Sequence, residues 1–131
     1  MTKAAGTFDL ASWDENTYEE LDTGSKLTMA AVTQKFEGDI AGEGAARWLM
    51  FYHDDGTAHF VGLQRVTGSI GKRAGSFVLE TTGDFDGKTA EWDASVVRGS
   101  ATGELEDLAG TGSFGAPKGP KASFELEYRF E

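Results

Sequence analysis

The sequence predicts an all-β domain that closes into an antiparallel barrel of eight strands. Three observations lead to this fold class. The 131 residues suit a single domain, residues 1–131, with one hydrophobic core. The 18 glycines, against 2 prolines, are spread along the chain, as strands joined by tight turns require. The 3 Trp, 3 Tyr and 9 Phe lie between these glycines, which excludes a low-complexity chain.

The first and last expected strands alternate apolar and polar residues, the period of a half-buried strand. The first runs from Gly6 to Trp13, with Phe8 on one face and Trp13 on the other, and the last ends at Phe130. The six strands between them are expected at about 26–36, 45–53, 57–67, 76–82, 88–97 and 110–114. Because closure removes exposed edges, we expect the first and last strands to pair.

Two segments depart from simple alternation. Residues 14–25 are polar and acidic, so we expect a helical turn or a mobile flap that packs down through Tyr18 and Leu21. Residues 45–53 contain five consecutive apolar residues, Trp48 to Tyr52, which predicts a strand covered on both faces. Such a strand also makes a subunit interface, and hence a homo-oligomer, compatible with the sequence.

The segment Asp54-Asp55-Gly56 is the strongest hairpin signal, because Asp-Gly favours tight turns. A two-residue loop would place Tyr52 opposite His59. A three-residue loop would shift the pairs by one residue and exchange the faces of one strand relative to the other. The sequence leaves both registers open.

Composition excludes several classes of function. The net charge of −10, from 22 acidic and 12 basic residues, opposes binding to nucleic acid or to an anionic membrane. Without cysteine there is no disulfide, thiolate nucleophile or cysteine-based zinc site. No stretch resembles a signal peptide or reaches the roughly 18 apolar residues of a membrane span, so we expect a soluble cytoplasmic protein.

Motifs for phosphate or metal binding are weak. The glycine-rich stretch 68–75 lacks the first glycine and the hydroxyl residue of a phosphate-binding loop and leads into a strand, which favours a basic hairpin turn. His53 and His59 flank Asp54 and Asp55, but a turn already explains these aspartates. We therefore expect neither a metal site nor a cofactor.

Two polar residues lie in otherwise apolar rows of neighbouring strands, Gln64 and Glu80. If these rows line the barrel, Glu80 is partly desolvated and is a candidate catalytic acid or base, with Gln64 as a second polar group. The alternative is that Phe77 and Leu79 face inward and leave Glu80 in water. The expected ligand-binding wall consists of Trp48, Met50, Phe60, Trp92 and Tyr128. Its mouth is expected near the glycine-rich segment 98–121, and Met50 shares a face with Phe60 only in the three-residue register.

Several ordered segments carry a resemblance to a known family. They include Trp13-Asp14-Glu15, Lys26-Leu27-Thr28, Phe36-Glu37-Gly38-Asp39-Ile40, Phe60-Val61-Gly62-x-Gln64, Gly75-Ser76-Phe77-Val78-Leu79-Glu80 and Ser100-x-Thr102-Gly103-Glu104-Leu105. Through them nearly the whole chain resembles a bacterial domain-of-unknown-function family with an allene-oxide-cyclase-like barrel. The resemblance implies an eight-stranded closed barrel with a hydrophobic lumen and no assigned reaction.

Two functions follow as hypotheses. In the first, the barrel binds a small apolar molecule in its lumen and acts as a cyclase or isomerase on a reactive intermediate, mainly by folding the substrate and excluding water. In the second, side chains fill the barrel, which then serves as a noncatalytic carrier or assembly module. The fold class alone is compatible with both.

Overall fold

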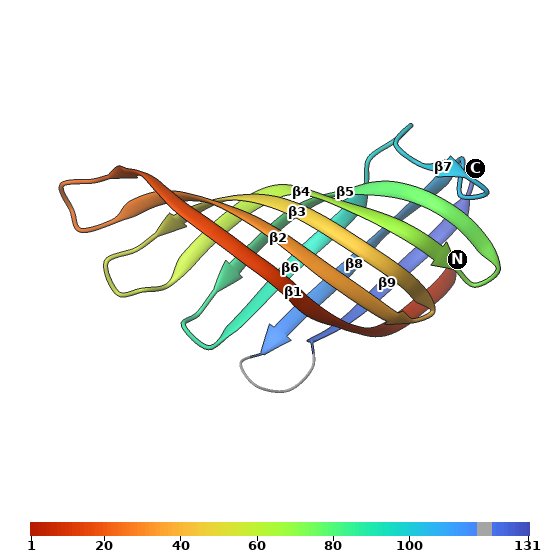
Figure 1. Cartoon of the computed structure of the whole chain (residues 1–131), viewed down its shortest axis with the longest axis horizontal. Helices are drawn as coiled ribbons and strands as arrows, with labels where there is room; N and C mark the ends of the chain where they lie inside the picture. The colour runs from red at the N-terminus through yellow and green to blue at the C-terminus, as the bar shows by residue number, and fades with distance from the viewer. Residues whose placement is uncertain (118–121) are drawn as a thin grey trace.

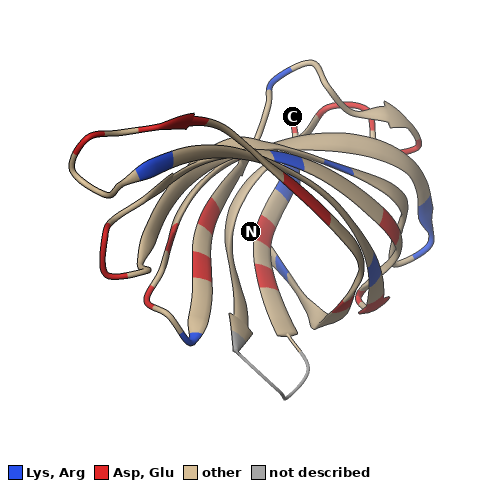
Figure 2. Ribbon diagram, turned by 60° about the vertical axis from the view of Figure 1, so that its left-hand side comes forward, with Lys and Arg blue, Asp and Glu red and all other residues tan. Residues whose placement is uncertain are grey.

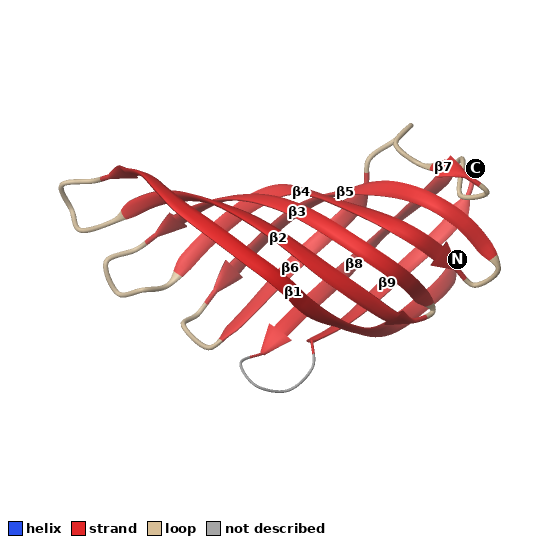
Figure 3. Cartoon of the chain, in the orientation of Figure 1, coloured by secondary structure: helices blue, strands red, loops and turns tan. Residues whose placement is uncertain are grey.

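The computed structural model describes residues 1–117 and 122–131, which contain strands and turns but no helix (Figure 3). The strands are β1 (Thr2–Glu20), β2 (Lys26–Gly38), β3 (Ile40–Tyr52), β4 (Ala58–Ile70), β5 (Arg73–Phe85), β6 (Thr89–Val96), β7 (Thr102–Gly103), β8 (Leu108–Pro117) and β9 (Ala122–Phe130).

Eight of these strands close into an antiparallel barrel (Figure 1). Each pairs with the next in the order β1, β2, β3, β4, β5, β6, β8 and β9, and β9 pairs back to β1. The short β7 adds to the edge of β5 at Gly75 and Ser76. The predicted fold class and the pairing of the first and last strands are therefore confirmed.

The strand β1 is longer than predicted and includes most of the acidic segment. It pairs with β2 as far as Glu20↔Lys26, so the helical turn or flap expected at 14–25 is wrong. Two register shifts, at Ala11 and at Tyr18, interrupt the pairing and hide the two-residue period. The first shift also reverses the faces of β1, which brings Trp13 to the same inner side as Phe8.

Only the first part of β1 seals the barrel. It pairs with β9 from Thr2 to Phe8, and beyond Phe8 its partner is β2 alone. The β1–β2 hairpin consequently extends beyond the ends of β8 and β9 (Figure 1). The inner face of this extension is partly open to solvent, and Trp13 is 45% exposed there.

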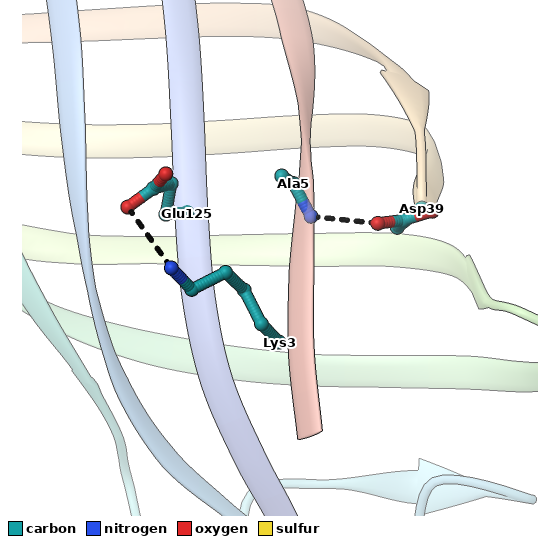
Figure 4. Close-up of polar contacts among 4 residues, drawn as sticks. All are labelled: Lys3, Ala5, Asp39 and Glu125. Carbon is teal, nitrogen blue, oxygen red and sulfur yellow. Dashed lines mark hydrogen bonds and ion pairs between the residues drawn. The ribbon is translucent and has the colours of Figure 1, made fainter. Parts of the chain in front are cut away.

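An aspartate on the turn between β2 and β3 fixes the start of β1 (Figure 4). The backbone N–H of Ala5 donates to Oδ2 of Asp39 at 2.9 Å, and the N–H of Asp39 donates to the carbonyl of Ala5 at 3.0 Å. The ammonium of Lys3 lies 3.9 Å from Oε2 of Glu125 on β9. These contacts connect β1 to the strands on both of its sides.

The β3–β4 hairpin adopts the three-residue register. Phe51 pairs with His59 and Met50 pairs with Phe60, so the two-residue register is wrong. Oδ1 of Asp55 accepts hydrogen bonds from the N–H and the hydroxyl of Thr57, which lower the pKa of Asp55. Gly56 has a φ of 89°, the left-handed conformation that ends such a loop.

Within this chain β3 is covered on one face only. Its inward residues Trp48 and Met50 are at most 4% exposed, whereas Leu49 on the outer face is 51% exposed. Leu49 lies between Met29 of β2 and Val61 of β4. The expectation that β3 is covered on both faces is therefore wrong for the single chain, which leaves an apolar outer surface uncovered.

Aromatic rings fill the middle of the barrel. The ring of Trp92 on β6 lies 5.0 Å from that of Trp48 on β3 and 5.8 Å from that of Phe8 on β1. Phe36 on β2 lies 6.3 Å from Phe114 on β8. Because rings from strands on different sides of the barrel touch, its middle contains side chains and not an open lumen.

The end of the barrel near the C-terminus is covered. Leu105 follows β7 and is 1% exposed within the core, and the N–H of Glu104 donates to the carbonyl of Ala74 at 2.9 Å. The mouth expected near residues 98–121 is therefore wrong for the part around β7 and Leu105, whereas Ser113, Phe114 and Gly115 of β8 line a depression at the opposite end, and 118–121 lie outside the described residues. The open face lies at the opposite end, beside the β1–β2 hairpin.

Candidate functional site

Four of the five predicted wall residues come together inside the barrel. The ring of Trp48 lies 5.3 Å from that of Phe60 and 5.0 Å from that of Trp92. Met50 is the cross-strand neighbour of Phe60. All four are at most 4% exposed, so they form a packed core.

The fifth wall residue, Tyr128, does not join this group. It pairs with Thr2 and Gly110 near the covered end of the barrel, and its ring contacts Phe130 at 6.0 Å. The sequence placed Tyr128 correctly on the inner face of its strand. It could not show how far along the barrel axis this residue lies from Trp48.

The two predicted catalytic residues lie on different faces of the wall. Gln64 points inward and is fully buried, whereas Glu80 is exposed on the outside of β5. Phe77 and Leu79 occupy the inner face at 1% exposure each, as the alternative interpretation had it. The expected desolvation of Glu80 is therefore wrong.

Gln64 belongs to a buried chain of hydrogen bonds with a fixed direction. The indole N–H of Trp92 can only donate, and it meets Oε1 of Gln64 at 3.3 Å. Nε2 of Gln64 then donates to Oε1 of Gln34 at 2.7 Å. Nε2 of Gln34 is left buried without a hydrogen-bond partner among the described residues. This series of hydrogen bonds thus ends inside the barrel at an N–H donor that has no described acceptor.

A carboxylate does face the inner side of the barrel, at its open end, and it belongs to Glu15 of β1. Its Oε1 accepts a hydrogen bond from the indole N–H of Trp13 at 2.8 Å. Its Oε2 accepts one from the hydroxyl of Thr28, a buried residue of β2, at 2.6 Å. Two donors thus fix the orientation of this carboxylate, whose side chain is only partly buried.

Aromatic rings flank Glu15 on both sides. The ring of Trp13 lies 6.0 Å from that of Trp48, so it extends the buried core into the open end. Tyr52 lies at the end of β3, with the ammonium of Lys26 5.1 Å from its ring centroid. Burial, followed by hydrogen bonding to Glu15 and its negative charge, raises the pKa of Tyr52 to about 12.

A depression of about 920 Å³ reaches the neighbours of Tyr52. Its lining includes His53, which follows Tyr52 in the chain, and Ala58, which pairs with it. The depression continues past Phe85 to Trp92. We call Trp13, Glu15, Thr28 and Tyr52 the open-end site, and the depression adjoins it beside Tyr52.

The open-end site can hold a ring against Trp13 and accept a hydrogen bond or a positive charge at Glu15. Sequence reasoning missed both residues because the bulge at Ala11 breaks the period of β1. The signal was present as Trp13 and Glu15 at a spacing of two, the same-face spacing of a strand.

One of the two histidines, His59, pairs with an exposed aspartate of β5. Nδ1 of His59 lies 2.9 Å from Oδ1 of Asp84 on the exposed surface. Over residues 1–117 and 122–131, no group of three or more His, Cys, Asp or Glu side chains is arranged to hold a metal ion. In the same ranges, no helix is long and apolar enough to cross a membrane.

Comparison with known proteins identifies relatives without an assigned activity. A family model described as "Protein of unknown function (DUF3224)" matches residues 4–128. The crystal structure of a DUF3224 protein of unknown function from Shewanella oneidensis MR-1 is similar, with a TM-score of 0.80 and 27% identity over 100% of this chain and 98% of that one. No curated protein matches the chain.

Proposed function

Since the chain belongs to the DUF3224 family, whose description assigns no function, we propose from its geometry that it binds a small molecule with an apolar body at the open-end site. The observation that carries the proposal is Trp13. Its large ring faces the inside of the barrel, rests on buried Trp48 and is still 45% exposed. A ring that only completed a core would be covered.

The site lies at the end of the barrel and not in a central lumen. The packed rings of Phe8, Trp48 and Trp92 leave no room for a ligand in the middle. A ligand that stacks on Trp13 gains apolar contact without displacing any of these rings. The same ligand reaches Glu15, whose two hydrogen bonds hold it in place before binding.

A cyclase or isomerase activity would use the polar groups of this site. Glu15 would accept a proton, and Tyr52, with a pKa of about 12, would remain a neutral hydrogen-bond donor at neutral pH. In this proposal Glu15 takes the acid or base role expected of Glu80, and Tyr52 takes the place of Gln64 as the second polar group.

One observation favours a noncatalytic module as the second candidate. The filled interior and the uncovered outer surface of Met29, Leu49, Val61 and Leu63 suit a subunit that associates through its wall. This candidate predicts association with another chain and no small-molecule binding at Trp13. The expected homo-oligomer belongs to it.

Binding of a neutral fluorescent apolar probe, N-phenyl-1-naphthylamine, tests the proposal. We expect its fluorescence to rise on binding the wild-type protein, and Trp13→Ala to weaken binding about tenfold, because stacking on a large ring contributes roughly 1 kcal/mol or more. Glu80→Gln should leave the affinity unchanged, because Glu80 lies on the outside of β5.

The matched control is Leu49→Ala, which removes an equally exposed apolar side chain from the outer wall. If Leu49→Ala weakens binding and Trp13→Ala does not, the probe binds the outer surface and the proposed site is wrong. Light scattering on the same samples reports the oligomeric state. A dimer that Leu49→Ala dissociates, without probe binding, would support the noncatalytic module.

A further inference from the structure

We infer that the ligand of the open-end site is an organic cation, a substituted ammonium group on an apolar body. This inference rests on the proposed function and specifies the class of molecule bound. It depends on the carboxylate of Glu15, which forms no ion pair among the described residues, and on the aromatic surface that surrounds this carboxylate.

The first argument is the set of partners of Glu15. Its oxygens accept hydrogen bonds from the indole N–H of Trp13 and the hydroxyl of Thr28, and Tyr52 is a further hydrogen-bonding neighbour; all three are neutral groups. Among the described residues Glu15 forms no ion pair with lysine or arginine. No cationic side chain pairs with this partly buried carboxylate, so a cationic ligand could take that place.

The second argument is the aromatic surroundings. Trp13 presents an exposed ring beside Glu15, and the face of an aromatic ring attracts cations. Tyr52 already shows this behaviour, because the ammonium of Lys26 lies 5.1 Å from its centroid. An aromatic surface next to a carboxylate is the combination that recognises alkylated ammonium groups.

The third argument is the charge of the adjoining depression. Five of its described lining residues are acidic, and none is lysine or arginine: Asp84, Asp86, Glu91, Asp93 and Glu125. The backbone N–H groups of Thr89 and Lys88 donate to Asp86 and lower its pKa, which keeps that carboxylate charged. Acidic residues also dominate the tip of the β1–β2 hairpin (Figure 2). Asp84, Glu91, Asp93 and Glu125 are exposed residues that alternate with the inward-facing ones, so they lie on the outside of the wall. Their charge gives this end of the molecule a negative potential, which favours the approach of a cation over that of an anion.

Two probes of nearly the same shape separate the effect of charge from that of apolar contact. Phenyltrimethylammonium and tert-butylbenzene differ in one central atom, which is a charged nitrogen in the first and a carbon in the second. Quenching of tryptophan fluorescence measures the affinity of each for the wild-type protein. We expect the cation to bind at least about tenfold more tightly.

Glu15→Gln then tests the proposed counter-charge. Glutamine keeps the shape of the side chain and one acceptor oxygen, so we expect the affinity for the cation to fall about tenfold while that for the neutral probe stays the same. The matched control is Asp14→Asn, the same loss of charge at the adjacent, exposed position on the opposite face of β1. It should leave both affinities nearly unchanged at physiological ionic strength.

The outcomes distinguish this inference from the function on which it rests. Equal affinities for the two probes, both lowered by Trp13→Ala, would overturn the cationic ligand and leave the binding site in place. No binding of either probe would overturn both. If Asp14→Asn removes the preference for the cation as completely as Glu15→Gln does, the preference comes from the overall negative charge of the protein and not from Glu15. This result would also overturn the inference. The comparison of probes on the wild-type protein needs no variant to fold.

Discussion

Replacing Gly83 with alanine should destabilise the barrel strongly, because this buried glycine makes room for two aromatic rings. A Cβ at position 83 would lie 2.3 Å from the carbonyl oxygen of Glu91, 2.5 Å from Cβ of Trp92 and 2.7 Å from Cζ of Phe60. The first two atoms cannot move by a change of rotamer. Overpacking of this kind costs about 1–3 kcal/mol, and we expect the upper part of that range.

The matched control is Gly115→Ala, since a Cβ at Gly115 would meet no atom within 4 Å and its φ is not in the left-handed range. Alanine lowers the conformational entropy of the unfolded chain, so this change should raise the free energy of unfolding by about 0.5 kcal/mol. The free energies of unfolding of the two variants should therefore differ by roughly 3 kcal/mol. Urea unfolding followed by tryptophan fluorescence measures both values. Two variants of equal stability would refute the idea that strand glycines accommodate the rings.

Two further predictions concern the polar groups inside the barrel and at its open end. Gln64→Met should cost about 2–3 kcal/mol, because it leaves Trp92 and Gln34 without partners, whereas Gln34→Met also removes the spare amide and should cost about 1 kcal/mol. The double variant should show a coupling of about 1 kcal/mol in urea unfolding, and strictly additive effects would contradict the hydrogen-bonded chain. In an ultraviolet titration, Tyr52→Phe should remove a component near pH 12. Because the neutral form of Tyr52 is favoured in the folded state, its stabilising effect should be complete below pH 10 and lost as the pH rises to about 12, and an unchanged titration curve would contradict this assignment.

The sequence was sufficient for the architecture because its strongest signals are local. The alternation of apolar and polar residues from Phe124 to Phe130 predicts a strand with one buried and one exposed face. Turn sequences such as Asp55-Gly56 predict that neighbouring strands form hairpins. Antiparallel hairpins in succession leave few alternatives to a closed barrel. For the same reason the sequence alone predicts Trp48, Phe60 and Trp92 as interior residues, and the structure buries all three.

Ambiguous alternation explains the errors in the candidate site. In β5 both faces contain apolar residues, and the inner face continues from Leu79 to Thr81 and Gly83, which have no large apolar side chain. Glu80 could therefore be assigned to either side. The glycine at 83 is small because Trp92 lies against it, a long-range fact that no local pattern contains.

The bulge at Ala11 links the closure of the barrel to the choice of side chains that face inward at its open end. Before it, the even-numbered residues of β1 face inward and close the barrel against β9, whereas after it Trp13 and Glu15 face inward at odd positions. One inserted residue thus converts a sealing strand into a strand that carries a site. Inserting or deleting one residue of β1 between Phe8 and Trp13 would therefore change which side chains the open end displays.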